Sequence, residues 1–182
     1  MTFVLGNQTI FPPVLLAPLA GITDVPFRNL VQSFGAGLVV SEMVASHEMA
    51  QKKPGVRERA ELGFGIDSTS VQIAGCDAYW MAEAARMIEA NGAKIIDINM
   101  GCPVKKVFKQ GACSALIGEP GLAKEIITAT KEGTHLPVSV KTRTGIKQHQ
   151  TEEWISQLLE VEPAAIILHG RTQRMQSDGD AN

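Results

Sequence analysis

The chain has 182 residues, of which 45% are hydrophobic and 20% are charged, and its formal net charge is −2. This composition is typical of a globular protein, and a chain of this length can bury a substantial core. The small negative charge excludes a basic field over the whole molecule, so a nucleic-acid partner would have to be held by a local basic patch.

Cysteine usage and the N-terminus bear on the compartment. The three cysteines, Cys76, Cys102 and Cys113, lack the spacing of a disulfide framework, and this favours a reduced protein. The first residues lack the basic n-region of a signal peptide, and no apolar run approaches the ~18 residues of a membrane helix. We therefore expect a soluble, cytoplasmic protein without a membrane partner.

Short apolar runs alternate along the chain with amphipathic stretches. The apolar runs predict six strands, at 14–21, 38–44, 70–75, 94–101, 136–145 and 164–172. Helical spacing of apolar residues predicts helices at 27–34, 77–92, 121–133 and 151–161. We expect residues 52–59 to form a charged surface connection. The strands are nearly continuous apolar runs, which is typical of a parallel sheet covered on both faces.

The helix between Asp77 and Gly92 has the clearest signals. Asp77 can cap its first turn and Gly92 can end it. The apolar residues at helical spacing between them are Trp80, Met81, Ala84, Ala85 and Ile88.

Polar residues lie at or near the C-terminal ends of successive predicted strands: Glu42, Gln72, Asn99, Lys141 and His169. Convergence of many strand ends on one point is typical of a (β/α)₈ barrel, whereas an open sheet gathers ligand groups at one switch point. The first strand is also not followed by a GxGxxG motif. The sequence therefore predicts an α/β TIM barrel that is incomplete, because about six βα units are present and a barrel has eight.

Two cations stand at the end of the fifth strand, in "SVKTRTG". Lys141 inside an apolar strand is rarely buried without a partner, and Arg143 points the same way two residues later. A cation here can hold an electron-rich ligand such as a reduced flavin. The alternative is a lysine that reaches water at the end of the strand.

His169 ends the sixth strand, and Gly170 after it permits a close approach to the backbone. A neutral histidine can donate a hydrogen bond or move a proton, or it can be a core residue bonded to a carbonyl. Gln72 and Asn99 offer both donors and acceptors to a planar heterocycle, with packing in a barrel layer as the alternative.

Cys102 lies between Gly101 and Pro103 in a basic segment with Lys105 and Lys106, "MGCPVKKVFK". We expect a flexible loop that carries this thiol above the strand ends, where it can act as an acid, a nucleophile or a metal ligand. No CxxC or HExxH pattern accompanies it, so we expect no metal. Cys76 and Cys113 are expected to be bystanders.

Seven segments in order resemble the tRNA-dihydrouridine synthases, and the bacterial B-type subfamily is the most similar. They are "APLAGITDVPFR", "GAGLVVSEM", "VQIAG", "IIDINMGCPVKKV", "GACSAL", "VKTRTG" and "LHGRT". The resemblance implies a TIM barrel that binds FMN, followed by a helical domain that binds tRNA. On this basis residues 1–182 are the N-terminal part of the barrel, and the last barrel strands and the helical domain lie outside them.

The resemblance also implies the chemistry. FMN reduced by NADPH passes a hydride to C6 of a uridine in tRNA, and Cys102 protonates C5 as general acid. It implies flavin contacts at six positions: Pro18, Leu19, Ala20, Gln72, Lys141 and His169. Asn99 and Arg143 are implied to contact the base, and Lys105 and Lys106 can meet RNA phosphates. An ordinary thiol pKa near ~8.5 would keep Cys102 protonated at pH 7.

Three positions differ from the family pattern: Leu19 stands in place of a methionine, Phe108 in place of a polar residue and Cys113 in place of a glycine.

Two other functions stay open. One is a flavin-dependent barrel reductase acting on a free pyrimidine, similar to dihydroorotate dehydrogenase. The other is an inactive, truncated barrel fragment.

Overall fold

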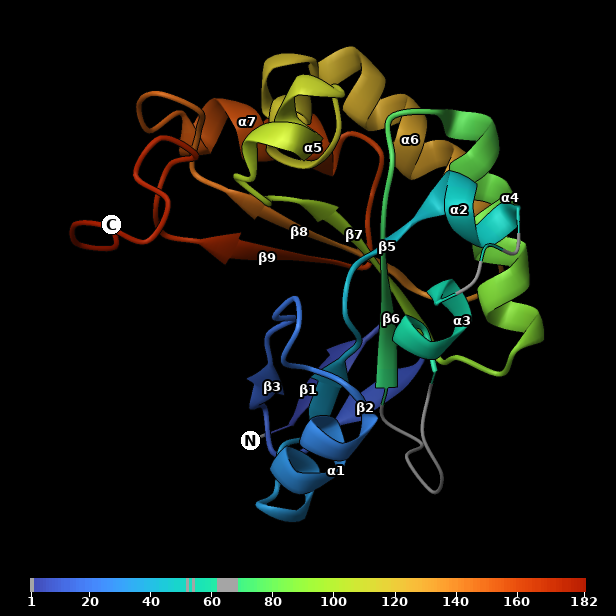
Figure 1. Ribbon diagram of the computed structural model, residues 1–182. Helices are drawn as coiled ribbons and strands as arrows, with labels where there is room; N and C mark the ends of the chain where they lie inside the picture. The colour runs from blue at the N-terminus through green and yellow to red at the C-terminus, as the bar shows by residue number, and fades with distance from the viewer. Residues whose placement is uncertain (1, 52, 54, 62–68) are drawn as a thin grey trace.

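The computed structural model describes residues 2–51, 53, 55–61 and 69–182, and its main feature is a curled parallel sheet (Figure 1). The strand order is β3-β4-β6-β7-β8-β9, with β5 beside β6. The strands are β3 (Leu15–Leu16), β4 (Leu38–Val40), β5 (Val44–Ala45), β6 (Thr69–Ala74), β7 (Ile95–Met100), β8 (Val138–Arg143) and β9 (Ala165–His169). Six successive units of parallel sheet curl as part of a (β/α)₈ barrel, so the predicted fold class is confirmed.

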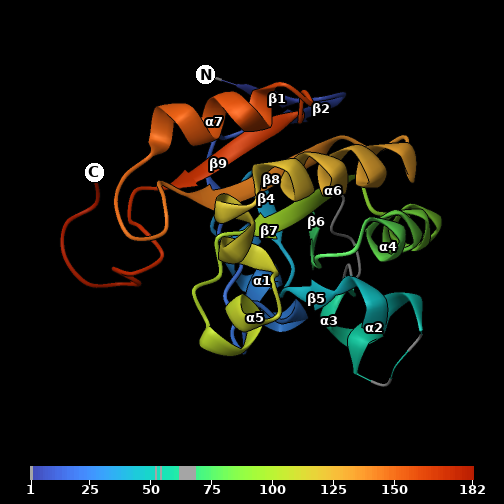
Figure 2. The same ribbon diagram turned by 90° about the horizontal axis from the view of Figure 1, so that it is seen from above.

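Helices surround the sheet, and most of them pack on its convex side. They are α1 (Val25–Ser33), α2 (Ser46–Ala50), α3 (Val56–Arg59), α4 (Ala78–Ala90), α5 (Lys105–Lys109), α6 (Pro120–Glu132), α7 (Thr151–Leu159) and the 3₁₀ helix η1 (Cys113–Gly118). Figure 2 shows α4, α6 and α7 following one another around the outside of the strands. None of the described helices is long and apolar enough to cross a membrane.

The strands alternate between an apolar and a more polar face, although most residues of β4, β6, β7 and β8 are buried. In β7, Ile96, Ile98 and Met100 belong to the core cluster that also contains the buried faces of α4, α6 and α7. The residues between them, such as Asp97 and Asn99, face the concave side. The prediction of nearly continuous apolar strands missed this alternation, which a polar barrel interior requires.

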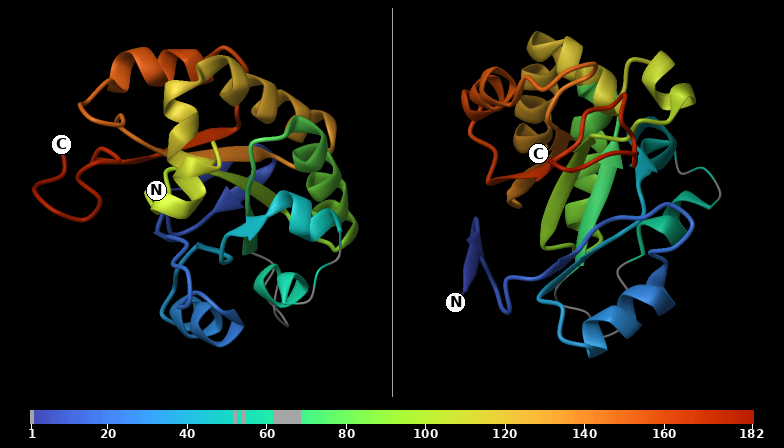
Figure 3. Two further views of the ribbon diagram at one scale, coloured as in Figure 1. Left: turned by 45° about the horizontal axis from the view of Figure 1, so that its top comes forward. Right: turned by 90° about the vertical axis from the view of Figure 1, so that its left-hand side faces the viewer.

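An N-terminal hairpin closes one end of the concave side, and the sequence analysis did not predict it. Its strands β1 (Phe3–Leu5) and β2 (Gln8–Ile10) pair with each other and with no described strand of the main sheet. Figure 3 shows this hairpin as a separate piece beside the sheet. Leu5 and Ile10 pack against Leu38 and Ile95 in a second, smaller core cluster. The hairpin thus packs at the N-terminal ends of the strands, and the polar residues lie at the opposite, C-terminal ends.

The predicted helix signals between Asp77 and Gly92 are confirmed. The Asp77 side chain accepts a hydrogen bond from the Trp80 N–H, at 3.1 Å, and so caps α4. Gly92 follows the helix with a φ of +89°, a conformation that glycine adopts without strain. Of the apolar residues at helical spacing, Trp80 is half-buried and the other four are fully buried.

Several predicted strands are shorter than expected, and those at 14–21 and 38–44 differ most. Only Leu15–Leu16 of 14–21 is a strand, and 38–44 divides into β4 and β5 around Ser41. The Ser41 hydroxyl donates to the Glu42 carbonyl and accepts from the Gln72 N–H, so the chain bends there. Hydropathy cannot show such a break because the residues on both sides are apolar.

The segment after β7 is also more ordered than predicted. Instead of one open loop, it contains α5 and η1, and η1 packs on β7 and β8. In the segment 52–59, expected as a connection, Val56–Arg59 form α3, and residues 52 and 54 lie outside the described part.

Candidate active site

The polar residues singled out from the sequence share the concave face. Strand register places Gln72 opposite Asp97, and Asn99 opposite Lys141. Arg143 is opposite His169 on the next strand. Because paired residues of parallel strands point to the same face, these side chains converge near the carboxyl ends of β6 to β9.

Three of these side chains form a directed chain of hydrogen bonds, which we call the amide relay: Asp97, Gln72 and Asn99. Gln72 Nε2 donates to Asp97 Oδ2 at 2.6 Å, and Asn99 Nδ2 donates to Gln72 Oε1 at 2.9 Å. An ionised carboxylate only accepts, so Asp97 fixes which end of the Gln72 amide faces it, and Gln72 in turn fixes Asn99.

Asp97 lies at the buried end of the relay and is 1% exposed. Ser139 Oγ donates to its other oxygen at 2.6 Å. Burial raises the pKa of Asp97 to about 6, against the opposing effects of the Ser139 and Gln72 hydrogen bonds and the Lys141 charge. Asp97 was not predicted as a site residue, although its position two residues before Asn99 places it on the same strand face.

The turn that carries Cys102 is fixed by side chains from three parts of the chain. Asn99 Oδ1 accepts from the Gly101 and Cys102 N–H groups, at 3.0 and 2.9 Å. Ser114 Oγ donates to the Cys102 carbonyl at 2.7 Å, and Arg143 Nε donates to the Gly101 carbonyl at 2.7 Å. The amide relay therefore ends at the backbone of Cys102 itself.

The Cys102 thiol is half-buried and its pKa is lowered to about 6. The main cause is a hydrogen bond from the Cys113 thiol. The Val104 N–H and the Arg143 charge act in the same direction, and burial opposes them. The expectation of an ordinary thiol pKa is therefore wrong, because the sequence showed nothing of the contact with Cys113.

Cys113 is fully buried beneath Cys102, and the prediction that it is a bystander is wrong. Its hydrogen bond to Cys102 and its burial raise its pKa. Its sulfur also lies 3.6 Å from Met43 Sδ. A thiol has one proton to donate, and a thiolate accepts more strongly than a thioether, so the ionised Cys102 takes that hydrogen bond.

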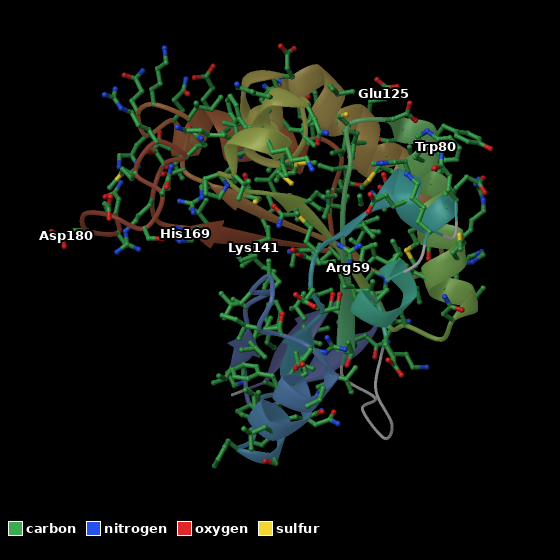
Figure 4. All side chains as sticks on the ribbon, in the orientation of Figure 1. Arg59, Trp80, Glu125, Lys141, His169 and Asp180 are labelled. Carbon is green, nitrogen blue, oxygen red and sulfur yellow. The ribbon has the colours of Figure 1, made fainter. Side chains whose placement is uncertain are left out.

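Lys141 and His169 lie on neighbouring strands, and Figure 4 labels both. Among the described residues, Lys141 has no hydrogen-bond partner. Burial lowers its pKa, the Asp97 charge opposes that change and the Arg143 charge adds to it. Its ammonium group is thus a partly buried donor for which the described residues offer no acceptor.

The His169 ring accepts a hydrogen bond at Nδ1 from the Arg171 N–H, at 3.2 Å. Burial lowers the pKa of His169, and the charges of Arg143, Lys141 and Arg171 lower it further. The ring is therefore neutral at pH 7, and its proton is on Nε2. This leaves one N–H donor beside Lys141.

Arg143 was expected to contact a substrate base, and the structure shows it 6% exposed and bonded to backbone carbonyls. Besides Gly101, it donates from Nη1 to the Thr172 and Gln176 carbonyls, at 3.0 and 2.8 Å. It ties the Cys102 turn to the segment after β9. Gln72 is 0% exposed, and both ends of its amide bond to the relay.

The remaining predicted residues lie at the rim. Leu19 and Ala20 are exposed and Pro18 is half-buried, in the loop after β3. That loop is held by Glu42, whose carboxylate accepts from the Gly21 N–H. Lys105 and Lys106 are exposed on α5. The described residues contain no group of three or more His, Cys, Asp or Glu side chains that would hold a metal ion.

The fold and this arrangement define the class: an incomplete (β/α)₈ barrel whose polar residues meet at the carboxyl ends of the strands. A solved structure of histamine dehydrogenase from Rhizobium sp. 4-9 has the same fold, with a TM-score of 0.67 and 12% identity, over 92% of this chain and 36% of that one. The sequence profile of the dihydrouridine synthase family matches residues 15–182. The chain belongs to that family.

Named relatives agree with this assignment. A probable tRNA-dihydrouridine synthase of Rhodobacter capsulatus is 50% identical over 97% of this chain and 55% of its own length. The tRNA-dihydrouridine synthase B of Serratia marcescens is 43% identical over 97% of this chain and 54% of its own length. The chain thus spans about 55% of the length of these relatives, and the resemblance stated from the motifs is confirmed.

Proposed function

We propose that the chain forms most of the catalytic barrel of a tRNA-dihydrouridine synthase, which reduces the C5–C6 double bond of uridines in tRNA with FMN and NADPH. The observation that carries this proposal is the meeting of Lys141, His169 and the Cys102 turn at the strand ends. The family membership and the names of the relatives support it. A tRNA substrate also agrees with the expected cytoplasmic location.

The residues at the strand ends fit a flavin in part. The Lys141 ammonium without an acceptor and the neutral His169 with a free Nε2–H suit its electron-rich, carbonyl-bearing ring. The exposed loop of Pro18, Leu19 and Ala20 offers a surface beside them. Gln72 fits less well, because both ends of its amide are engaged by the relay. Bound and reduced FMN would supply the hydride for C6 of uracil.

In this proposal Cys102 supplies the proton for C5. With a pKa of about 6, it is about one-tenth protonated at pH 7. The Cys113 thiol keeps its own proton because its pKa is raised, so the pair of cysteines holds one proton at neutral pH. If proton transfer from Cys102 limits the rate, the rate falls as pH rises through about 6.

The RNA would meet α5 beside this site. Lys105, Lys106 and Lys109 are exposed there, and none of them forms an ion pair with the described residues. Unpaired cations on one short helix suit phosphate groups, and they favour RNA over a free pyrimidine. Each phosphate contact would make the affinity fall with rising salt.

The first test is a flavin titration of the chain, alone and joined to the C-terminal half of the Rhodobacter capsulatus relative. We expect the joined protein to bind FMN with a changed flavin spectrum, and Lys141→Met to weaken binding at least about tenfold. Lys124→Met is the matched control, because Lys124 bonds to Gln157 and Glu160 on the outer side. Failure of the joined protein to bind FMN would contradict the proposed cofactor.

The second step adds tRNA and NADPH to the joined protein. We expect dihydrouridine in tRNA, and a loss of at least about a hundredfold in rate with Cys102→Ala. Turnover of free uridine as good as that of tRNA would contradict the RNA substrate and support the pyrimidine reductase. Tight FMN binding without any turnover would support an inactive barrel.

A further inference from the structure

A second thiol lies directly against Cys102. The Cys113 thiol lies close enough to the Cys102 sulfur to be the main cause of the lowered pKa of Cys102. The two segments are also joined directly, because the Ser114 side chain donates from Oγ to the Cys102 carbonyl at 2.7 Å. The ten residues between the cysteines fold back through α5, and this return brings the two thiols together.

The Cys113 side chain is held in one orientation. Its φ is +55°, in the left-handed region, and the side chain is 0% exposed. The Met43 thioether lies on its other side, 3.6 Å from Cys113 Sγ. Solvent therefore reaches this pair of thiols through Cys102, which is half-buried.

The two thiols differ in exposure and in charge state. Cys102 is the accessible one and is ionised at neutral pH, so it is the sulfur that an oxidant meets first. Cys113 keeps its proton and is shielded from oxidants. It lies within reach of a sulfenic acid formed on Cys102.

We propose that Cys102 and Cys113 are a modification site, at which a peroxide converts the two thiols into a reversible intramolecular disulfide. The Cys102 thiolate attacks hydrogen peroxide, the O–O bond breaks, and sulfenic acid and hydroxide form. The Cys113 sulfur then attacks the Cys102 sulfur, and the hydroxyl leaves as water with the Cys113 proton. Each sulfur loses one electron, and peroxide is reduced to two molecules of water.

The disulfide would remove the thiol of Cys102 from any proton transfer. This consequence rests on the proposed function, whereas the formation of the bond does not. A dithiol reductant would return both cysteines to their reduced form.

The test is mass spectrometry of the protein after treatment with hydrogen peroxide, with free thiols blocked and tryptic digestion done without reductant. Trypsin separates the cysteines, because Lys105, Lys106 and Lys109 lie between them. We expect peptides 95–105 and 110–124 to be joined, and dithiothreitol to release them. The peptide 60–86 with Cys76 should stay unlinked.

Two variants keep the result interpretable. Cys113→Gly suits the left-handed backbone, so we expect it to fold, to lose the joined peptides and to let Cys102 proceed to sulfinic acid. Cys76→Ser should keep the joined peptides at the wild-type level. The exposed Cys76 thiol bonds to the Gln110 carbonyl at 3.3 Å and is the other cysteine nearby.

Oxidation of wild-type Cys102 to sulfinic acid without joined peptides would overturn the proposal, and so would a link from Cys102 to Cys76. The readout is a peptide mass, so it does not depend on activity. If the protein reduces tRNA, peroxide should also abolish that activity, and dithiothreitol should restore it in the wild type and in Cys76→Ser but not in Cys113→Gly. Joined peptides without tRNA reduction would separate failure of the proposed function from failure of this inference.

Discussion

At the scale of single residues, the orientation of the amide relay depends on the buried carboxyl of Asp97. The relay has one direction, from Asn99 through Gln72 to Asp97, because an ionised carboxylate cannot donate. The other end of the relay is the Asn99 side-chain oxygen, which accepts a hydrogen bond from the Cys102 N–H. A buried acid that costs stability thus orients the turn of the proposed catalytic thiol.

The cost of burying Asp97 predicts a pH dependence of stability. The pKa of Asp97 rises from 3.8 to about 6 on folding, so the folded state binds this proton more tightly than the unfolded chain does. The stabilisation is present below pH 3.8 and is lost as pH rises through about 6, and it amounts to about 2–3 kcal/mol. Asp97→Asn should remove this loss.

Urea unfolding at pH 4, 5, 6 and 7 measures the effect. All other carboxylates are common to both proteins, so the difference between wild type and Asp97→Asn isolates this group. The variant should gain stability relative to the wild type as pH rises. Parallel stability curves for the two proteins would show that Asp97 does not carry the raised pKa.

The direction of the relay can be reversed by exchanging its two ends. Asn99→Asp alone places a second carboxylate against Gln72, whose single N–H₂ group already bonds to Asp97, and should cost about 2–3 kcal/mol. In the double variant Asp97→Asn/Asn99→Asp, Gln72 can turn its amide over. The carboxylate introduced at position 99 would then accept from Gln72 and from the Cys102 turn.

A double-mutant cycle by urea unfolding at pH 7 tests this reversal. We expect Asn99→Asp to cost about 1–2 kcal/mol less in the Asp97→Asn background than in the wild type. Additive effects of the two substitutions would mean that the relay does not act as one directed chain.

At the scale of elements, the layer of helices on the outside depends on one close approach. Gly133, at the end of α6, has an ordinary φ of −78°, so its backbone would accept an alanine. A Cβ there would lie 2.5 Å from the Ala82 carbonyl oxygen of α4 and 2.9 Å from its Cα. The two helices pack this closely only because no side chain stands between them.

Gly133→Ala should therefore destabilise the protein by about 1–3 kcal/mol, because backbone atoms of α4 must move. Gly121→Ala is the matched control in the first turn of α6, where a Cβ meets nothing within 4 Å. It should leave stability unchanged or raise it by up to about 1 kcal/mol. Thermal and urea unfolding compare the two, and equal effects would contradict close packing as the cause.

At the scale of the whole molecule, Arg143 connects segments that are distant in sequence. Its guanidinium donates to Gly101 before α5 and to Thr172 and Gln176 after β9. Gln173 Nε2 adds a further bond to the Pro103 carbonyl, at 3.3 Å. The segment after β9 is therefore held against the Cys102 turn by side chains, beyond the edge of the sheet.

Arg143→Met should release this segment and expose it to trypsin, with cleavage after Arg171 and Arg174 about tenfold faster or more. Lys141→Met is the control on the same strand, since Lys141 has no hydrogen bond to the described residues. Intact mass spectrometry at successive times of digestion measures the cleavage rates of the wild type and the two variants. Equal rates in all three proteins would show that Arg143 does not hold the segment.

Local sequence signals were sufficient to predict the fold class, the four longer helices, the polar strand ends and the family. These follow from local signals: apolar periodicity, the Asp77 cap with the Gly92 stop, and short motifs around Cys102, Lys141 and His169. Such signals are readable because each depends on neighbours within a few residues. Boundaries were less certain where apolar residues continue past the end of a strand, as at 14–21.

The chemistry of the candidate site depends on contacts between segments that are distant in the sequence. Asp97 and Cys113 were passed over because their partners, Gln72 and Cys102, are 25 and 11 residues away in the sequence. The lowered pKa of Cys102, the engaged amide of Gln72 and the carbonyl contacts of Arg143 all arise from such distant contacts. Hydrogen bonding and burial set the charge state of a side chain, and both depend on which segments the fold brings together.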